Sequence, residues 1–218
     1  MTNKKLRVFS IFKSIQGESS RAGLPCVFVR LAGCPLRCVY CDTKEAACAD
    51  GELMTINEIL NKVKGLNATM VEVTGGEPLA QKDTPALLDA LLKAEYEVLL
   101  ETSGAFDISR LNPHIKIIMD MKTPGSTMHE RMIVGNLKSL VLGHHELKFA
   151  ITSKEDFDWS INLILHENLV NKCELLISPV PGLVSPDEAA RWILGCGLKL
   201  RLQLQLHKII WPNSKEER

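Results

Sequence analysis

The order of apolar and amphipathic segments constrains the fold of this chain most. Short apolar runs, each followed by a turn and then an amphipathic segment, recur along its 218 residues. The runs predict strands at 27–31, 70–73, 98–100, 115–119, 146–151, 174–177 and 200–206, and the amphipathic segments predict helices at 55–63, 84–93, 154–166 and 186–194. Strands that alternate with helices favour a parallel sheet. We therefore expect an α/β fold, a partial, open TIM-like barrel of about six parallel β/α units, since the chain is too short for eight.

Charge and length limit the location and the partners of the protein. Lys plus Arg and Asp plus Glu number 26 each, so no net charge attracts nucleic acid or an anionic membrane. The apolar runs are far shorter than the roughly 20 residues of a membrane span, and the polar segment 1–7 lacks the apolar core of a secretory signal. We expect one cytoplasmic domain over residues 1–218, with a frayed, charged tail at 213–218 and no nucleic-acid or membrane partner.

Three of the seven cysteines lie close together, at Cys34, Cys38 and Cys41. Their spacing, C-x3-C-x2-C, lets three thiolates wrap one face of a metal cluster and leaves one metal position open. A structural zinc site is the alternative, but it needs a fourth ligand, for which Cys48 is the nearest candidate. The remaining cysteines are expected to be small buried residues; they are Cys26, Cys48, Cys173 and Cys196.

Polar and glycine-rich segments follow the predicted strands. Since the carboxyl ends of parallel strands meet at one edge of a sheet, these segments are expected to form one site. They are 33–41, 74–78, 101–104, 120–122 and 178–181.

The cysteine loop, with Tyr40 before its last cysteine, resembles the hallmark of the radical S-adenosylmethionine (SAM) superfamily, and the sequence from Thr74 to Pro78 resembles its "GGEP" motif. The resemblance implies a 4Fe–4S cluster on Cys34, Cys38 and Cys41 whose open iron chelates SAM. Reduction then yields a 5′-deoxyadenosyl radical. The cofactor-binding residues that it implies are Gly76 and Glu77 for the methionine amino group, Glu101, Ser103, Asp120, Met121 and Lys122 for the ribose and carboxylate side, and Ser178, Pro179, Val180 and Pro181 for the adenine end.

Both ends of the chain narrow this resemblance. The sequence SIQGES at 14–19, Arg30, the sequence CDT at 41–43 and the sequence QLQLHKIIWP at 203–212 resemble the 7-carboxy-7-deazaguanine synthase family. The similarity runs from about residue 9 to residue 212 and is weak between 126 and 148. It implies a radical ring contraction of 6-carboxy-5,6,7,8-tetrahydropterin to 7-carboxy-7-deazaguanine, with loss of ammonia, on the way to queuosine and related deazapurines. One departure is the pair Asp120-Met121, where other members carry Ser-Pro.

The same resemblance assigns residues to the substrate. Arg30 offers a fork-shaped cation for the pterin carboxylate. Thr43 is expected to coordinate a Mg²⁺ that bridges to this carboxylate, although it could instead cap the cysteine loop. The other expected substrate residues are Ile15, Gln16, Gly17 and Glu18 at the pterin edge, Thr74 beside the cofactor, and His207 and Pro212 on the last strand and its exit. A homodimer and an electron donor such as flavodoxin or ferredoxin are also implied.

Two other functions stay open on the sequence alone. A glycyl-radical-enzyme activase shares the cysteine loop and the glycine turn, but it acts on a protein partner and needs no Mg²⁺. A non-catalytic zinc or iron–sulfur module would bind metal without cleaving SAM. The segments 15–18 and 207–212 favour the pterin enzyme over both.

Overall fold

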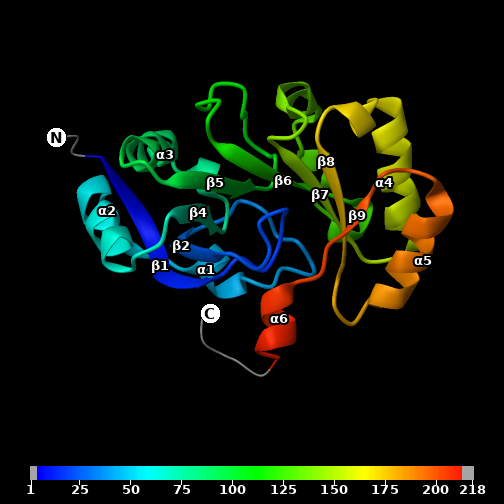
Figure 1. The fold of residues 1–218 in the computed structure, drawn as a ribbon, viewed down its shortest axis with the longest axis horizontal. Coiled ribbons are helices and arrows are strands. Elements are labelled where there is room, and N and C mark those ends of the chain that lie inside the picture. Colours follow the sequence, from blue (N-terminus) through cyan, green and yellow to red (C-terminus); the bar gives the residue numbers. More distant parts are fainter. Residues whose placement is uncertain (1–3, 213–218) are drawn as a thin grey trace.

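The computed structural model describes residues 4–212 and contains a nine-stranded sheet in the order β3-β1-β2-β4-β5-β6-β7-β8-β9 (Figure 1). The tail at 213–218 lies outside the described residues. The strands are β1 Lys5–Ile15, β2 Pro25–Leu31, β3 Glu52–Thr55, β4 Met70–Gly75, β5 Glu97–Thr102, β6 Lys116–Lys122, β7 Glu146–Ile151, β8 Glu174–Pro179 and β9 Arg201–Leu202. The helices are α1 Lys44–Cys48, α2 Ile56–Gly65, α3 Thr84–Lys93, α4 Lys154–His166, α5 Pro186–Cys196 and α6 Leu206–Ile210, with 3-10 turns η1 Pro78–Ala80, η2 Pro124–Ser126, η3 His129–Arg131, η4 Val134–Ser139 and η5 Leu169–Asn171.

The sheet is the open α/β sheet that the alternating pattern predicts. Strand β2 and strands β4 to β9 run parallel, whereas β1 pairs antiparallel with both β2 and β3. The end strands β3 and β9 lie at opposite edges of the strand order, so the barrel stays open. No helix within residues 4–212 is long and apolar enough to cross a membrane.

The expected strand at 200–206 is wrong over most of its length. Only Arg201 and Leu202 pair with β8, and the chain then leaves the sheet to form α6. The cause is tertiary: the backbone N–H of Leu206 donates to the carbonyl of Gly17 at 2.9 Å, which draws this segment across the concave face. His207 therefore lies on a helix and not on a strand.

Residues of the parallel strands alternate between two environments. On β4, Val71 and Val73 are fully buried in the main core, against helices such as α2 and α3 (Figure 1). Glu72 and Thr74, which lie between and after them, face the concave side. The apolar core thus fixes the register of the strand, and the register in turn places the polar side chains in the site.

The concave side has its own small apolar layer. Cys26, Met70, Leu99 and Ile118 form a second cluster of buried residues, against which Phe28 packs.

The β1–β2 loop, residues 16–24, is attached to the sheet by hydrogen bonds and an ion pair to two acidic side chains. The backbone N–H and the hydroxyl of Ser20 donate to Glu146, and Arg21 Nε lies 2.6 Å from Glu97 Oε1.

The scattered cysteines are only partly as expected. Cys26 and Cys173 are buried, which agrees with the role of small apolar residues, and Cys196 is half-buried. Cys48 is exposed, because it ends the short helix α1 on the surface of the protein, so the expectation that it is buried is wrong.

Asp156, in the first turn of α4, connects this helix to the loop after β6. Its carboxylate is buried and accepts from Thr152 N at 2.9 Å and from Gly125 N at 2.8 Å. Gly125 belongs to η2, and the carbonyl of the next residue, Ser126, accepts from Val39 N in the cysteine loop at 3.4 Å. Asp156 therefore supports the cysteine loop indirectly.

We expect Asp156→Ala to lower the free energy of unfolding by about 2 kcal/mol or more, because it leaves buried N–H groups without an acceptor. Urea denaturation followed by circular dichroism measures the loss. Asp158→Ala on the same helix is the control, since Asp158 is exposed and its ion pair with Lys154 contributes about 0.5 kcal/mol or less. Equal losses in the two variants would contradict this role of Asp156.

Candidate functional site

A cavity of about 250 Å³ opens on the concave face, at the carboxyl ends of the parallel strands. All five segments that the sequence places after strands contribute to its wall. Of the expected site residues, the cavity wall contains Ile15, Gln16, Gly17, Glu18, Arg30, Cys34, Cys38, Cys41, Thr43, Thr74, Gly76, Glu101, Ser103, Asp120, Lys122, Ser178, Pro179, Val180, Pro181 and His207. The fold thus gathers residues that are far apart in the sequence.

The cysteine loop is held by its own backbone and by Arg37. The Arg37 guanidinium donates to the carbonyls of Cys34 at 2.6 Å and of Leu36 at 2.7 Å, and Cys41 N donates to Cys38 O at 3.2 Å. The three thiols are partly exposed and line the cavity. Among residues 4–212, no group of three or more His, Cys, Asp or Glu side chains has the geometry to hold a single metal ion.

The glycine turn packs directly against the cysteine loop. Gly76 N donates to Leu31 O, and Glu77 N donates to Gly33 O, each at 3.0 Å. A Cβ on Gly76 would lie 2.1 Å from Gly33 O, and Gly75 has a φ of +138° that side chains rarely allow. These positions require glycine, because any side chain would push the two loops apart.

Glu77 supports the loop after β5. Its carboxylate is fully buried and is not part of the cavity wall. It accepts from Leu79 N at 2.9 Å, from Thr102 Oγ1 at 2.8 Å and from Ser103 N at 2.7 Å. These bonds fix the Ser103 loop, and a contact of Glu77 with the methionine amino group stays a prediction from the resemblance.

Two other expected residues do not reach the cavity with their side chains. Met121 is buried in the main core, because successive residues of β6 alternate and Asp120 and Lys122 take the concave side. Pro212 is exposed beyond α6 and is absent from the cavity wall. Their roles in binding stay predictions from the resemblance, and the side chains of neither residue line the cavity.

A segment near the N-terminus and a segment near the C-terminus meet at one side of the cavity. Gln16 Nε2 donates to Glu72, and Gln16 Oε1 accepts from Glu18 N at 3.1 Å, so the amide is held from both sides. A Cβ on Gly17 would lie 2.2 Å from His207 Nδ1, which shows how closely this loop approaches α6. Residues 15–18 and His207 therefore form one continuous wall.

Arg30 lies between this wall and the cysteine loop. It is on β2, in register with Thr74 of β4, and both line the cavity. Its guanidinium carbon lies 5.7 Å from the centre of the Phe12 ring, and Phe12 stacks on Phe28 at 5.2 Å. The aromatic pair holds the guanidinium by a cation–π contact.

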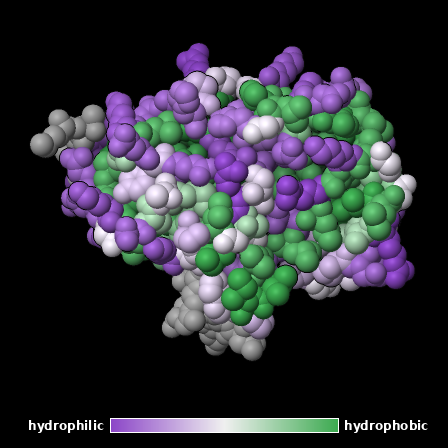
Figure 2. Space-filling view, in the orientation of Figure 1, coloured by the Kyte–Doolittle hydropathy of each residue, from purple (hydrophilic) through white to green (hydrophobic). Residues whose placement is uncertain are grey.

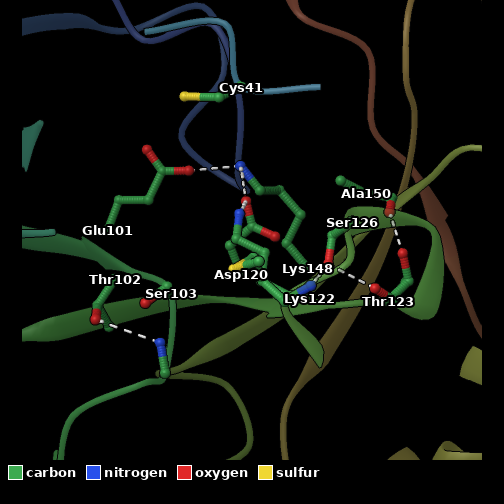
Figure 3. A network of polar contacts seen from close by, with 12 residues as sticks. Cys41, Glu101, Thr102, Ser103, Asp120, Lys122, Thr123, Ser126, Lys148 and Ala150 are labelled. Carbon is green, nitrogen blue, oxygen red and sulfur yellow. Dashed lines mark hydrogen bonds and ion pairs between the residues drawn. The ribbon is translucent and has the colours of Figure 1, made fainter. Parts of the chain in front are cut away.

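Several cavity residues were not expected from the sequence. Lys148 of β7 forms ion pairs with Glu18 and Glu101, and Figure 3 shows the pair with Glu101. A lysine inside a buried central strand is unusual and could have indicated a functional residue. The sequence around the other unexpected residues, Glu72, Asp42, Gln205 and Lys208, gives weaker indications of function. In the structure, Gln205 Nε2 and Lys208 Nζ each donate to Asp42 Oδ2 at 3.0 Å.

Charges in the cavity are arranged in opposite pairs. Burial acts to lower the pKa of Lys148, but Glu101, Glu18 and Asp120 outweigh it and hold this pKa well above its ordinary value. Burial likewise opposes ionisation of Asp120, yet Lys122 and Lys148 keep its pKa below the ordinary range. Both groups are therefore charged at neutral pH.

Glu72 behaves in the opposite way. It is 3 % exposed, and burial, together with the nearby Glu101 and Glu18, raises its pKa well above the ordinary value. Its hydrogen-bond donor is the neutral amide of Gln16. Glu72 is thus the carboxyl of this cavity that takes up a proton most readily.

Comparisons with known proteins identify the family and the fold of the chain. The Radical SAM superfamily matches residues 28–130. A 7-carboxy-7-deazaguanine synthase of Chlorobaculum tepidum is 44% identical over 218 residues, covering 98% of each chain, and one of Koribacter versatilis is 36% identical over 96% of this chain and 99% of its own. In fold, the chain resembles a crystal structure of QueE from Escherichia coli, with a TM-score of 0.76 and 23% identity over 93% of this chain and 95% of that one.

The chain belongs to the 7-carboxy-7-deazaguanine synthase family. It is therefore an enzyme of the radical SAM type, and the family implies SAM and a 4Fe–4S cluster as cofactors. The structure fits both groups: three thiols of one loop line the cavity, and Gly76, without a side chain, lines it beside them. A non-catalytic metal module does not agree with this membership.

The raised pKa of Glu72 has a consequence for stability. A carboxyl whose pKa is raised by folding stabilises the protein below its unfolded pKa and loses this contribution as pH rises through its folded pKa. We expect wild-type protein to lose more stability than Glu72→Gln between about pH 5 and pH 8, by up to about 1.4 kcal/mol per pH unit. Urea denaturation at several pH values measures both curves; parallel curves would show that Glu72 does not titrate in this range.

Proposed function

We propose that this protein catalyses the ring contraction of 6-carboxy-5,6,7,8-tetrahydropterin to 7-carboxy-7-deazaguanine, with release of ammonia. One observation carries the proposal: the wall formed by residues 15–18, Arg30 and His207 faces the same cavity as the cysteine loop and the glycine turn. The full-length relatives of this name support it. The product would serve the synthesis of queuosine and related deazapurines.

The cofactor side of the cavity would hold the cluster on Cys34, Cys38 and Cys41 and SAM along the ends of strands β4 to β8. When bound, these groups supply the 5′-deoxyadenosyl radical that removes a hydrogen atom from the substrate. The backbone at Gly76, fixed against the cysteine loop, suits the methionine end. Ser103, Asp120 and Lys122 would meet the ribose and carboxylate, and the segment 178–181 would meet the adenine.

The substrate side would bind the pterin by its two polar ends. Arg30 would take the carboxylate through paired N–H groups, with the Phe12 ring limiting the motion of the guanidinium. Glu18 and the backbone of residues 15–17 would read the donors and acceptors at the opposite edge of the ring. The apolar layer that contains Leu99 and Ile118 lies beneath, where it excludes water from the reacting ring.

Mg²⁺ would bind at Thr43. Thr43 precedes α1 as its N-cap, but its hydroxyl makes no cap hydrogen bond and instead lies 3.9 Å from Cys41 Sγ. The side chain thus does not cap the helix, and its contact with Cys41 is the one by which it would cap the cysteine loop. The proposal of a Mg²⁺ ligand therefore rests on the family resemblance. One hydroxyl, the substrate carboxylate and water are the oxygen ligands that Mg²⁺ prefers.

Other parts of the proposal concern partners and location. A cytoplasmic homodimer that accepts electrons from a flavodoxin or ferredoxin suits a chain of this family. Exposed apolar side chains on and near α6, visible as an apolar region in Figure 2, are compatible with a protein contact there; they include Leu183, Ile209 and Ile210.

An anaerobic turnover assay tests the main proposal. Protein with a reconstituted cluster is mixed with SAM, a reductant and the carboxytetrahydropterin, and products are followed by liquid chromatography and mass spectrometry. We expect 7-carboxy-7-deazaguanine from wild-type protein, and neither product nor a full cluster from Cys38→Ala. A wild-type protein with a complete cluster that cleaves SAM but leaves the pterin unchanged would refute the proposal and favour an activase.

The Mg²⁺ site gives a separate prediction. Chelation of divalent cations should slow turnover of wild-type protein about tenfold or more, because the substrate carboxylate then lacks the cation that binds and neutralises it. Thr43→Ala should respond weakly to added Mg²⁺, whereas Thr43→Ser, which keeps the hydroxyl, should respond as wild type does. The measurement is the rate against Mg²⁺ concentration at constant iron content. Identical titrations for Ala and wild type would remove Thr43 from the metal site.

A further inference from the structure

Lys148 lies between carboxylates that come from three different parts of the fold. Its side chain is 7% exposed, and its ammonium lies 2.6 Å from Glu18 Oε2 in the β1–β2 loop and 3.6 Å from Asp120 Oδ2 on β6. It also donates to Glu101 Oε1 on β5. Figure 3 shows the ammonium between Glu101 and Asp120. One cation thus connects a loop near the N-terminus with two central strands.

The partners of Lys148 belong to opposite sides of the cavity. Glu18 is on the substrate wall, where its other oxygen accepts from Gln205 Nε2 at 2.8 Å. Glu101 is on the cofactor side, where its other oxygen accepts from Thr74 Oγ1 at 3.1 Å. Each carboxylate therefore uses one oxygen within its own wall and the other on Lys148.

The charge balance explains why one ammonium matters so much here. A buried ammonium is strongly unfavourable unless carboxylates compensate for its lost hydration. The converse also holds: without Lys148, Glu18 and Glu101 would face each other and Glu72 as uncompensated acidic groups in a partly closed cavity. Loss of this cation would drive the two walls apart.

We propose that Lys148 is a positioning residue that couples the two sides of the cavity, so that SAM on the cofactor side strengthens binding of the pterin on the substrate side. A ligand that orders Glu101 also orders the ammonium, and the ammonium in turn orders Glu18 before the second ligand arrives. The effect is reciprocal, because linkage requires each ligand to change the affinity of the other by the same factor. This proposal rests on the proposed function.

Binding to the holoenzyme tests the coupling. Anaerobically prepared protein with its cluster, kept without reductant so that no turnover occurs, is titrated calorimetrically with the carboxytetrahydropterin, with and without SAM. Wild-type protein should bind the pterin more tightly when SAM is present. Lys148→Met should bind it about tenfold to a hundredfold more weakly, and the ratio of its affinities with and without SAM should approach one.

Matched variants separate positioning from general damage. Lys154→Met, which removes an exposed lysine from α4, should keep both the wild-type affinity and the wild-type ratio. Glu18→Gln, which also loses a direct contact with the pterin, should bring the ratio of affinities with and without SAM toward one, and its combination with Lys148→Met should leave that ratio unchanged, because each variant already breaks the same connection. Should Lys148→Met fail to fold, Lys148→Gln, which keeps two N–H donors without the charge, takes its place in the same titrations.

The outcomes distinguish this proposal from the proposed function. If wild-type protein converts the pterin while the Lys148 variant, with normal iron content, keeps the wild-type ratio, Lys148 does not couple the two sides. A Glu18→Gln variant that keeps the wild-type ratio would also overturn the proposal. If wild-type protein does not bind the pterin at all, the proposed function itself fails, and no Lys148 variant is needed to decide that.

Discussion

The contact between the glycine turn and the cysteine loop determines the rest of this site. Leu31 and Gly33 at the end of β2 accept hydrogen bonds from the backbone of Gly76 and Glu77 at the end of β4, and the two loops approach so closely that a single Cβ on Gly76 would separate them. Because β2 and β4 are paired in register from Val27 and Val71 up to Leu31 and Gly75, this contact is set by the buried core. A cluster held on one loop would therefore meet a ligand held on the other at a fixed distance.

The concave face also depends on a balance of charge among its buried polar side chains. Carboxylates and ammonium groups are buried together there, and each is tolerated only because an opposite charge or a neutral donor compensates for lost hydration. Lys148, Lys122 and Asp120 remain charged on this basis, while Glu72, whose donor is an amide, favours the protonated form. The cavity can thus hold several acidic groups close together without unfolding the sheet.

Sequence patterns predicted the parallel strands β2 and β4 to β8, the helices α2 to α5 and the segments after the strands, because each depends on local periodicity and on the shared edge of a parallel sheet. They did not predict the antiparallel strands β1 and β3 or the short helices α1 and α6. They could not predict that Glu77 turns inward, since its partners Thr102 and Ser103 lie on another strand end. They also assigned 200–206 to a strand, because alternating Leu residues are typical of one; the contact of Leu206 with Gly17 depends on the distant β1–β2 loop. Lys148 was missed for the same reason: its three carboxylates come from separate elements.

Different parts of the cavity wall come from residues inside and outside the range that matches the superfamily. The superfamily match covers residues 28–130, which contain the cysteine loop, the glycine turn and the ends of β5 and β6, and so most of the cofactor side. Residues 15–18 and His207 come from outside this range and meet across the concave face, whereas Arg30, next to them in the cavity, lies within it. Lys148, on β7, also lies outside the matched range. Because it contacts Glu18 before this range and Glu101 within it, one buried ammonium joins the parts of the cavity wall that come from inside and outside the superfamily match.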